Sequence, residues 1–372
     1  MDKSCFILYT VAMRLDQKIR EKSARVGVIG LGYVGLPLAV AFARRGFKVT
    51  GIEVYAPRAT ALRKGRSYIE DVSSKELGAL IRSGAMTIDD TGAGIVKLDV
   101  ILVCVQTPLR KTKEPDISHI VAACRTVAKL LKRGTLIVLE STTYPGTTQE
   151  AVLPEIEKSG LKAGKDFWLA FSPERVDPGN QKWRIENTPK VVGGIDASST
   201  ALAVELYSTV ISKVVPVSSA GAAELVKLLE NTFRSVNIAL VNELAQICDR
   251  LGLDVWEIVA AAATKPFGFM PFWPGPGIGG HCIPKDPQLL AWKMKSLNFE
   301  PRFIELASTV NGQMPRYAVG RIARLLNADA KSVKDAKVLV LGVAYKPGVG
   351  DIRDSPSLAI MHLLAEDGAK IT

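Results

Sequence analysis

One cysteine of the chain lies in a setting that suits a nucleophile. Cys282 stands in the run GGHCIPKDP at 279–287, after a glycine pair that allows close backbone access, and the carboxylate of Asp286 lies four residues on. A thiolate in such a place can add to an aldehyde and hold it as a thiohemiacetal, and loss of a hydride then gives a thioester that water cleaves. The alternative is a small buried hydrophobe, which is our interpretation of Cys104, Cys124 and Cys248.

Two polar residues in an otherwise apolar segment could assist this thiol. Lys227 and Asn231 lie four residues apart in AELVKLLENTFR at 223–234, so they share one face if the segment is a helix. On the functional interpretation they donate to the oxygen on the reacting carbon, which is anionic in each tetrahedral species, and the lysine lowers the pKa of Cys282. On the structural interpretation Lys227 extends its charged end from a core helix to solvent.

Two polar clusters follow predicted strands, namely ESTT at 140–143 and SPER at 172–175. Ligands of open α/β sheets bind at the carboxyl ends of the strands, so Thr142 and Glu174 are candidates to hold or activate water. A turn-forming hydroxyl and a surface acid are the structural alternatives. His281 adjoins Cys282, but its spacing to other residues indicates no triad, and we do not predict that it acts as a base.

A glycine-rich turn predicts a dinucleotide site. Gly30, Gly32 and Gly35 form a GxGxxG motif, with Tyr33 and Val34 between them, after a predicted strand and at the start of a predicted helix. The first glycine permits the turn, the second admits the pyrophosphate and the third allows close helix packing. The helix N-terminus offers N–H groups to the phosphates.

A carboxylate in the next strand favours NAD as the cofactor. Glu53 ends that strand 18 residues after Gly35, where it can bind the ribose hydroxyls and repel a 2′-phosphate. Arg58 lies close enough in sequence to keep NADP open. A glycine-rich turn without any nucleotide is the structural alternative.

The elements that must position these residues predict an α/β fold. Helical patterns at 36–46 and 117–132 alternate with short apolar runs typical of buried strands, at 25–30, 47–53, 98–105, 135–142, 167–174 and 189–194. Such alternation predicts a parallel sheet with right-handed crossovers. We assign residues 25–219 to a Rossmann-type NAD-binding domain.

The N-terminal 24 residues are predicted to be an extension with a leading helix at 15–24. The apolar run at 5–13 could instead be a short signal-peptide core, although no convincing cleavage site follows it. Met1 and Met13 are alternative starts of translation.

The middle of the chain has a helical residue pattern in place of the alternating strands and helices. Residues 220–264 are almost wholly helical in pattern, with more apolar residues than one amphipathic stripe requires, so we expect a connector that also forms a homodimer interface. The Gly-, Pro- and aromatic-rich stretch at 265–287 is predicted to be an irregular functional loop. We assign 220–329 to this central domain, which includes a helical segment at 315–327.

A second Rossmann-like region begins near residue 330. A predicted strand at 337–347, a helix at 356–367 and a strand opening at 369–372 indicate that the chain stops inside this domain, which is therefore expected to be truncated.

Composition narrows the class of protein. The 372 residues carry 48 Lys and Arg against 37 Asp and Glu, and the net charge of +11 favours an anionic partner. The basic residues are scattered, so we do not predict nucleic-acid binding. Five scattered cysteines and three histidines argue against disulfides and a metal site and for a cytoplasmic protein. No apolar run reaches the length of a membrane span.

Six ordered motifs together resemble the UDP-glucose/GDP-mannose dehydrogenase family of nucleotide-sugar dehydrogenases. They are GLGYVGLPLA from Gly30, ESTTYPGTT at 140–148, FSPERVDPGN at 171–180, AELVKLLENTFR at 223–234, GIGGHCIPKDP at 277–287 and LGVAYKPGVGDIRDSPS at 341–357. The resemblance implies an NAD-binding domain, a helical linker that forms a dimer and a C-terminal UDP-binding domain. It implies a four-electron oxidation of a sugar C6 alcohol to a carboxylate with two NAD.

The resemblance also implies roles for individual residues. Cys282 is the nucleophile, Lys227 and Asn231 stabilise the oxyanions, and Asp286 aids Lys227 or the hydrolytic water. The residues expected to orient water and substrate are Thr142 and Glu174, those expected to contact NAD include Thr107 and Arg353, and the expected substrate contacts also include Arg175, Phe272, Trp273, Gly279 and Lys346.

Within the family the sequence is most like the UDP-N-acetylglucosamine 6-dehydrogenases. Pro178 stands where UDP-glucose enzymes tend to carry a second glutamate, and GGHC stands where they tend to read GGSC. The aromatic run at 263–284 could make room for an acetamido group. UDP-N-acetylmannosamine and UDP-glucose dehydrogenases remain alternatives.

Two other classes also remain open. A one-step hydroxyacid dehydrogenase would form one NADH per substrate, but it needs no cysteine loop. Family members continue beyond Thr372, so an inactive remnant that binds NAD or a UDP-sugar is the non-enzymatic alternative.

Overall fold

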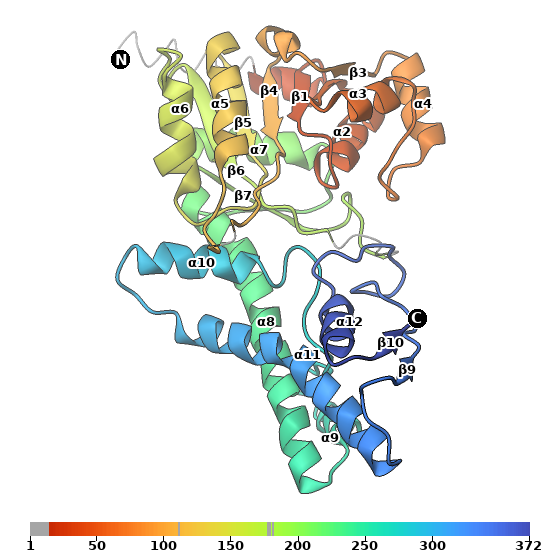
Figure 1. Cartoon of the computed structure of the whole chain (residues 1–372). Helices are drawn as coiled ribbons and strands as arrows, with labels where there is room; N and C mark the ends of the chain where they lie inside the picture. Colours follow the sequence, from red (N-terminus) through yellow and green to blue (C-terminus); the bar gives the residue numbers. More distant parts are fainter. Residues whose placement is uncertain (1–14, 111, 177–179, 181) are drawn as a thin grey trace. The chain divides into compact units, whose positions relative to one another are not determined.

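The computed structural model describes residues 15–110, 112–176, 180 and 182–372 (Figure 1). The predictions for residues 5–13, for the two candidate start methionines and for Pro178 lie outside this part of the chain. Contacts divide the chain into two units, the first ending at Lys227 and the second running from Leu228 to Thr372. We describe each unit by itself.

Within the described residues, unit 1 is built on one eight-stranded sheet of the order β3-β2-β1-β4-β5-β6-β7-β8. Its middle strands are buried along their whole length because helices cover both faces, which is why they are continuously apolar. The strands are β1 (Arg25–Ile29), β2 (Lys48–Ile52), β3 (Met86–Asp89), β4 (Val100–Val103), β5 (Thr135–Leu139), β6 (Phe167–Phe171), β7 (Lys190–Gly194) and β8 (Val214–Pro216).

The predicted α/β fold with a Rossmann-type sheet is confirmed, with one departure from parallel pairing. Strands β1 to β6 pair in parallel, but β7 runs antiparallel to β6 and parallel to β8. The chain between β6 and β7 contains no helix in its described residues, so no crossover returns it to the starting edge of the sheet.

Side chains that alternate along the strands pack into two hydrophobic cores, one on each face of the sheet. Val100 and Leu102 of β4 belong to one core and Ile101 and Val103 to the other, as the two-residue period of a strand requires. One core is completed by helices α2 (Gly35–Arg44), α4 (Ser74–Arg82) and α7 (Ala197–Ser208), and the other by η1 (Ala93–Lys97), α5 (Ser118–Leu130), the π-helical turn η2 (Thr148–Val152) and α6 (Leu153–Glu157) (Figure 1). The short helix α3 (Ala56–Arg63) follows β2. Of the helix predicted at 15–24, residues 15–20 are helical.

The predicted long helical segment is two helices. Helix α8 (Ala220–Leu251) begins in unit 1 and ends at Gly252, whose φ of +68° stops an α-helix. The Asp254 side chain then caps α9 (Val255–Ala262) by accepting the N–H of Trp256. No helix or strand occurs between Ala263 and Lys285, and α10 (Asp286–Lys295) follows.

The predicted helix at 315–327 was too short. Helix α11 runs from Arg302 to Ala328 and contains Pro315 in its interior. A proline is common in the first turn of a helix and rare in its interior. Here the helix continues through it, and Pro315 lacks the N–H that would bond to the carbonyl of Asn311.

The last region is a small α/β piece. Strands β9 (Lys337–Val338) and β10 (Lys370–Ile371) pair in parallel, with α12 (Pro356–Glu366) between them. The strand predicted at 337–347 is shorter in the structure, where Lys337 and Val338 form β9. Ser355 caps α12, and Pro356 occupies its first position.

Candidate active site

The three glycines of the first motif have three different surroundings. A Cβ on Gly30, whose φ is +88°, would lie 2.8 Å from the Cys104 carbonyl oxygen, and a Cβ on Gly35 would lie 1.9 Å from the Gly30 carbonyl oxygen. A Cβ on Gly32 would meet nothing within 4 Å. Two glycines are thus required by packing, and the third leaves open space at the start of α2, where a pyrophosphate fits against the helix N-terminus.

The carboxylate of Glu53 is held at the end of β2. Its two oxygens accept the backbone N–H groups of Leu31, at 3.3 Å, and Tyr55, at 3.0 Å. Nearby, the guanidinium of Arg58 lies 5.2 Å from the ring centroid of Tyr68. Burial, and then the charge of Glu53, raise the pKa of Tyr68 to about 12 in spite of Arg58. These residues and the glycine turn fit the ribose and phosphates of NAD.

The strand order reverses between β1 and β4, which is where such sheets bind dinucleotides. Thr107 follows β4, and its Oγ1 donates to the carbonyl oxygen of Thr142, which follows β5, at 2.6 Å. Ser141 Oγ donates to the Val105 carbonyl oxygen at 2.7 Å. The structure therefore brings together Thr107, predicted to bind NAD, and Thr142, predicted to hold water.

Glu174 and Arg175 follow β6 at the same edge of the sheet. One carboxylate oxygen of Glu174 accepts the backbone N–H groups of Arg175, at 2.8 Å, and Val176, at 2.6 Å. Arg175 Nη1 donates to the Pro189 carbonyl oxygen at 2.6 Å. Both side chains thus contact their own loops, and their predicted roles toward water and substrate stay predictions.

A buried polar cluster at these strand ends was missed by sequence reasoning. Lys190 Nζ lies 2.7 Å from Glu140 Oε2 and donates to the Pro173 carbonyl oxygen at 3.3 Å, while the Tyr207 hydroxyl donates to Glu140 Oε1. The Glu140 side chain is fully buried, and that of Lys190 is 6% exposed. The available signal was one charged residue directly after an apolar strand and another at the start of the run KVVGG.

The charges in this cluster follow from its contacts. Burial lowers the pKa of Lys190, but the carboxylates of Glu140 and Glu174 outweigh it and raise that pKa. Burial, and then the charge of Glu140, raise the pKa of Tyr207 well above its ordinary value. Lys190 is therefore charged, and Tyr207 keeps its proton to donate.

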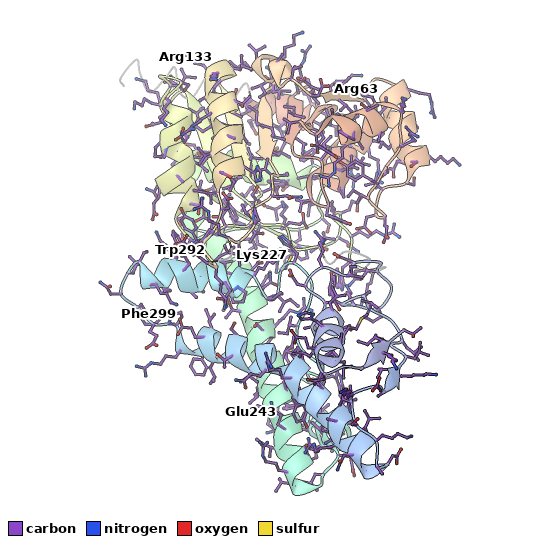
Figure 2. The ribbon with its side chains drawn as sticks, viewed as in Figure 1. Arg63, Arg133, Lys227, Glu243, Trp292 and Phe299 are labelled. Atoms are coloured by element: carbon purple, nitrogen blue, oxygen red, sulfur yellow. The ribbon has the colours of Figure 1, made fainter. Side chains whose placement is uncertain are left out.

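In unit 2 a hydrogen bond joins α8 to the end of the glycine-rich loop. Asn231 Nδ2 donates to Asp286 Oδ2 at 2.6 Å, and both side chains are buried. The Cys282 carbonyl oxygen accepts the backbone N–H groups of Lys285, at 3.1 Å, and Asp286, at 2.8 Å. The bond from α8 thus fixes the turn that carries Cys282. Lys227 lies one turn before Asn231 on α8 (Figure 2).

Exposure separates Cys282 from the other described cysteines. Cys282 is exposed, whereas Cys104, Cys124 and Cys248 are buried, as predicted for these three. Burial raises the pKa of Cys104 well above its ordinary value and that of Cys124 to about 12, so both thiols stay protonated. Among the described cysteines, Cys282 is the one that solvent can reach.

The glycines before Cys282 are required by packing, and the predicted contact of Gly279 with substrate stays a prediction. A Cβ on Gly279 would lie 2.5 Å from the Tyr345 Cβ, and one on Gly280, whose φ is +81°, would lie 2.7 Å from the Tyr345 ring. The Gly280 N–H donates to the Arg353 carbonyl oxygen at 3.1 Å. The loop is thus packed against the segment around Lys346, which is half-buried, and Arg353.

The charged side chains of this segment are paired. Arg353 makes a two-pronged contact with Asp351, from Nε at 2.9 Å and Nη2 at 2.6 Å, and Lys285 Nζ lies 2.8 Å from Asp354. Burial, and then the positive charges of Lys285 and Arg353, lower the pKa of His281. His281 is therefore neutral at neutral pH.

Aromatic side chains of the loop pack on the central helices. The Phe272 and Phe233 rings meet edge to face with centroids 5.8 Å apart, and the Trp273 and Trp256 rings stack with centroids 5.6 Å apart. Trp273 nevertheless remains 47% exposed. Both residues predicted to contact substrate are thus placed by α8 and α9.

Neither a metal-binding cluster nor a membrane-spanning helix is found among the described residues. No group of three or more His, Cys, Asp or Glu side chains is arranged to hold a metal ion. No helix in the part of the chain that the structure describes is long and apolar enough to cross a membrane.

The doubly covered sheet, the glycine turn and Glu53 define a dinucleotide-binding dehydrogenase. Family models of the UDP-glucose/GDP-mannose dehydrogenase family match all along the chain, the NAD binding domain over residues 24–211, the central domain over 221–313 and the UDP binding domain over 339–372. The chain therefore belongs to this family of NAD-dependent oxidoreductases that act on CH–OH groups, and its cofactor is NAD.

The chain is about equally similar to relatives named for UDP-N-acetylglucosamine and to relatives named for UDP-N-acetylmannosamine. The chain is 38% identical over 348 residues to a UDP-N-acetyl-D-glucosamine 6-dehydrogenase of Pseudomonas aeruginosa, covering 93% of this chain and 81% of that one. It is 36% identical over 341 residues to a UDP-N-acetyl-D-mannosamine dehydrogenase of Pyrococcus horikoshii, covering 91% and 80%.

A solved structure of a UDP-D-ManNAc dehydrogenase from Pyrococcus horikoshii superposes with a TM-score of 0.88 at 35% identity, covering 93% of this chain and 82% of that one. The resemblance drawn from the motifs is thus confirmed at the level of the family.

Proposed function

We propose that the chain is a nucleotide-sugar 6-dehydrogenase that oxidises the C6 alcohol of a UDP-N-acetylhexosamine, with UDP-N-acetylglucosamine as the substrate, to the uronic acid. The overall reaction converts one CH₂OH group, two NAD⁺ and one water into a carboxylate, two NADH and three protons. Bound NAD supplies the hydride acceptor for each oxidation. The observation that carries the proposal is the exposed Cys282 on a turn that α8 fixes through the bond between Asn231 and Asp286.

The residues of the chain divide the remaining chemistry among them. The Cys282 thiolate adds to the C6 aldehyde, and the new C–S bond holds the half-oxidised sugar as a thiohemiacetal. Lys227 and Asn231 donate to the oxygen on C6 while it is anionic. After the second oxidation the thioester is cleaved by a water that Thr142 and Glu174 orient, with Asp286 as an aid, and the thiol is released.

The choice of sugar rests on the glycine-rich loop. Its sequence, with paired aromatic side chains at Phe272 and Trp273, favours an N-acetylated hexosamine over glucose. The likeness to a UDP-D-ManNAc dehydrogenase structure favours UDP-N-acetylmannosamine as the second candidate. UDP-glucose is third.

An NADH assay over UDP-GlcNAc, UDP-ManNAc and UDP-glucose, with the product identified by mass, tests this proposal. We expect two NADH per UDP-GlcNAc and a uronic acid product. One NADH per sugar would indicate a one-step dehydrogenase, and NAD binding without turnover of any UDP-sugar would indicate an inactive remnant.

Cys282→Ser tests the covalent step. We expect free uronate to form at least about 10³-fold more slowly, because the hydroxyl is a far weaker nucleophile at neutral pH. The matched control is Cys124→Ser, which changes a buried thiol and should turn over normally. Normal uronate formation by Cys282→Ser would remove the covalent step from the proposal.

We also propose that α8 forms a homodimer. Leu229, Leu240 and Leu251 on this helix are each more than 60% exposed, so a monomer would leave much apolar surface in water. Light scattering on the purified protein tests this proposal. We expect the mass of a dimer, and a monomer that persists at high concentration would contradict it.

A further inference from the structure

Two buried asparagines form a chain of hydrogen bonds that the proposed chemistry does not use. Asn242 Nδ2 donates to Asn311 Oδ1 at 2.9 Å, and Asn311 Nδ2 donates to the Ser235 carbonyl oxygen at 3.1 Å. At the other end, Asn242 Oδ1 accepts the backbone N–H of Gly275 at 2.9 Å. The Asn242 side chain is completely buried. The chain therefore links α8, α11 and the glycine-rich loop.

The backbone groups of Gly275 and Ser235, at the two ends of this hydrogen-bond chain, determine the orientation of both amides. The Gly275 N–H can only donate and the Ser235 carbonyl can only accept, so each amide has one arrangement that satisfies all partners. Turning over either amide would place two acceptors or two donors in contact. The link is thus directional, and Asn242 is the residue that touches the loop.

Asn242 and Asn231 hold the loop on the two sides of Cys282. The two asparagines are 11 residues apart on α8, which is about three turns, so they lie on nearly the same face, roughly 16 Å apart. Asn242 holds Gly275, which precedes Cys282, and Asn231 holds Asp286, which follows it. These two anchors and the glycine packing thus hold the segment that carries the exposed Cys282.

Between these anchors the loop lies beside Pro315, which stands inside α11. Pro315 provides no N–H to the carbonyl of Asn311, and the loop passes close to this point. A Cβ on Gly277, whose φ is +134°, would lie 3.4 Å from the Asn311 carbonyl oxygen and 3.1 Å from the Pro356 Cβ. Asn311 is thus linked to the loop in two places. Its side chain is bonded to Asn242, which in turn holds Gly275, and its backbone carbonyl lies beside Gly277.

We propose that Asn242 is a positioning residue, which holds the Gly275 backbone so that Cys282 captures the aldehyde before it escapes. The proposal rests on the proposed role of Cys282 as the nucleophile. Asn242 acts only in the step that needs the thiol. Its loss should therefore change how the aldehyde is partitioned between release and further oxidation, and leave NAD binding unchanged.

The matched pair Gly275→Pro and Gly275→Ala tests this in the whole 372-residue chain. Proline removes the N–H that Asn242 accepts, whereas alanine keeps it, and a Cβ at this position would meet only a carbonyl oxygen at 3.9 Å. The assay counts NADH per UDP-sugar and traps released aldehyde with semicarbazide. We expect Gly275→Ala to yield two NADH per sugar, and Gly275→Pro to approach one, with an oxidation of the aldehyde that is about tenfold slower or more.

Substitutions of Asn242 itself separate positioning from stability. Asn242→Ala removes the acceptor for Gly275, whereas Asn242→Asp keeps it but buries a carboxylate and so destabilises the fold more. We expect Asn242→Asp to form close to two NADH per sugar although it melts at the lower temperature. Asn242→Ala should melt at the higher temperature but form closer to one NADH per sugar. Gln246→Leu, one turn further along α8 and in contact with Met314 instead of the loop, is the control and should keep the ratio at two.

The failure of this inference differs from the failure of the proposed function. If Gly275→Pro and Asn242→Ala both retain two NADH per sugar, or lose both oxidations equally, Asn242 does not position the thiol. If Cys282→Ser also retains two NADH per sugar, the covalent mechanism itself is wrong. A low ratio in Cys282→Ser together with a ratio of two in Gly275→Pro removes only the role of Asn242.

Discussion

The two units hold their functional segments in different ways. Unit 1 joins the ends of β5, β6 and β7 with a buried ion pair between Lys190 and Glu140, which the Tyr207 hydroxyl completes. Unit 2 holds its loop with the neutral amides of Asn242 and Asn311 and with one amide-to-carboxylate bond from Asn231. Loss of one partner of a buried ion pair leaves an unpaired charge in the protein interior. In a chain of neutral amides, no charge is left, but each amide must keep the one orientation that satisfies its hydrogen bonds. We therefore expect unit 1 to depend on charge and unit 2 on hydrogen-bond orientation.

The largest expected effect on stability is that of Lys190→Met. Removal of the cation leaves Glu140 buried without its partner, and such losses destabilise by about 3–5 kcal/mol. Urea denaturation followed by circular dichroism measures this change. The double variant Lys190→Met with Glu140→Gln should recover part of the loss, since no buried charge then remains. A single variant as stable as the wild type would show that the pair is not what ties these strand ends.

Two glycines of the dinucleotide turn should separate stability from cofactor affinity. Gly35→Ala places a Cβ 1.9 Å from a backbone oxygen, so we expect a loss of about 1–3 kcal/mol in the free energy of unfolding. Gly32→Ala meets no protein atom, so stability should hold while the added methyl group weakens NAD binding. Calorimetric titration with NAD and thermal melts measure the two effects. Equal loss of NAD affinity and of stability in both variants would contradict this division.

A smaller effect concerns acid stability in unit 1. Burial disfavours the charge on Asp99, but the Arg25 N–H, Lys18 and Lys132 outweigh it and hold the pKa of Asp99 below its ordinary value. Because the folded-state pKa is depressed, this stabilisation is present above the unfolded-state pKa and is lost as the pH falls through the folded-state pKa. Asp99→Asn should cost about 1 kcal/mol at neutral pH and less in acid.

The control for this acid effect lies in unit 2. Asn242→Ala should destabilise by a similar amount at pH 7 and at pH 4, because an amide does not titrate in this range. Melting temperatures over a pH series for both variants test the contrast. A pH-independent loss in Asp99→Asn would mean that its contacts matter as packing and not as charge.

Much of the fold could be predicted because its secondary structure depends on residues that are close together in the sequence. Six of the eight strands of the sheet, the dinucleotide turn and the helical character of 220–262 follow from apolar runs, glycine positions and helical periodicity. Strands β3 and β8 were not predicted. The predictions failed where a distant partner decides. β7 turns antiparallel, and α11 continues through Pro315.

Of the candidate site, the sequence indicated the residue types but not their contacts. Asn231 and Asp286 are 55 residues apart, and their bond was not predicted although both were named. The bond between Lys190 and Glu140, 50 residues apart, was not predicted either, because a single lysine or glutamate beside an apolar strand looks like an ordinary surface residue. The roles assigned to Thr142, Glu174 and Lys227 remain predictions.

By itself, the sequence determined the class of fold, the dinucleotide turn and the family, because these depend on glycine stereochemistry, strand and helix periodicity and short motifs that adjacent residues carry. Only the tertiary structure decided that Cys282 is exposed while three other cysteines are buried, and that Asn242 and Asn231 hold the loop on both sides of it. The physical reason is that burial and hydrogen-bond partnership are properties of groups far apart in the chain, which become neighbours only when helices and loops pack.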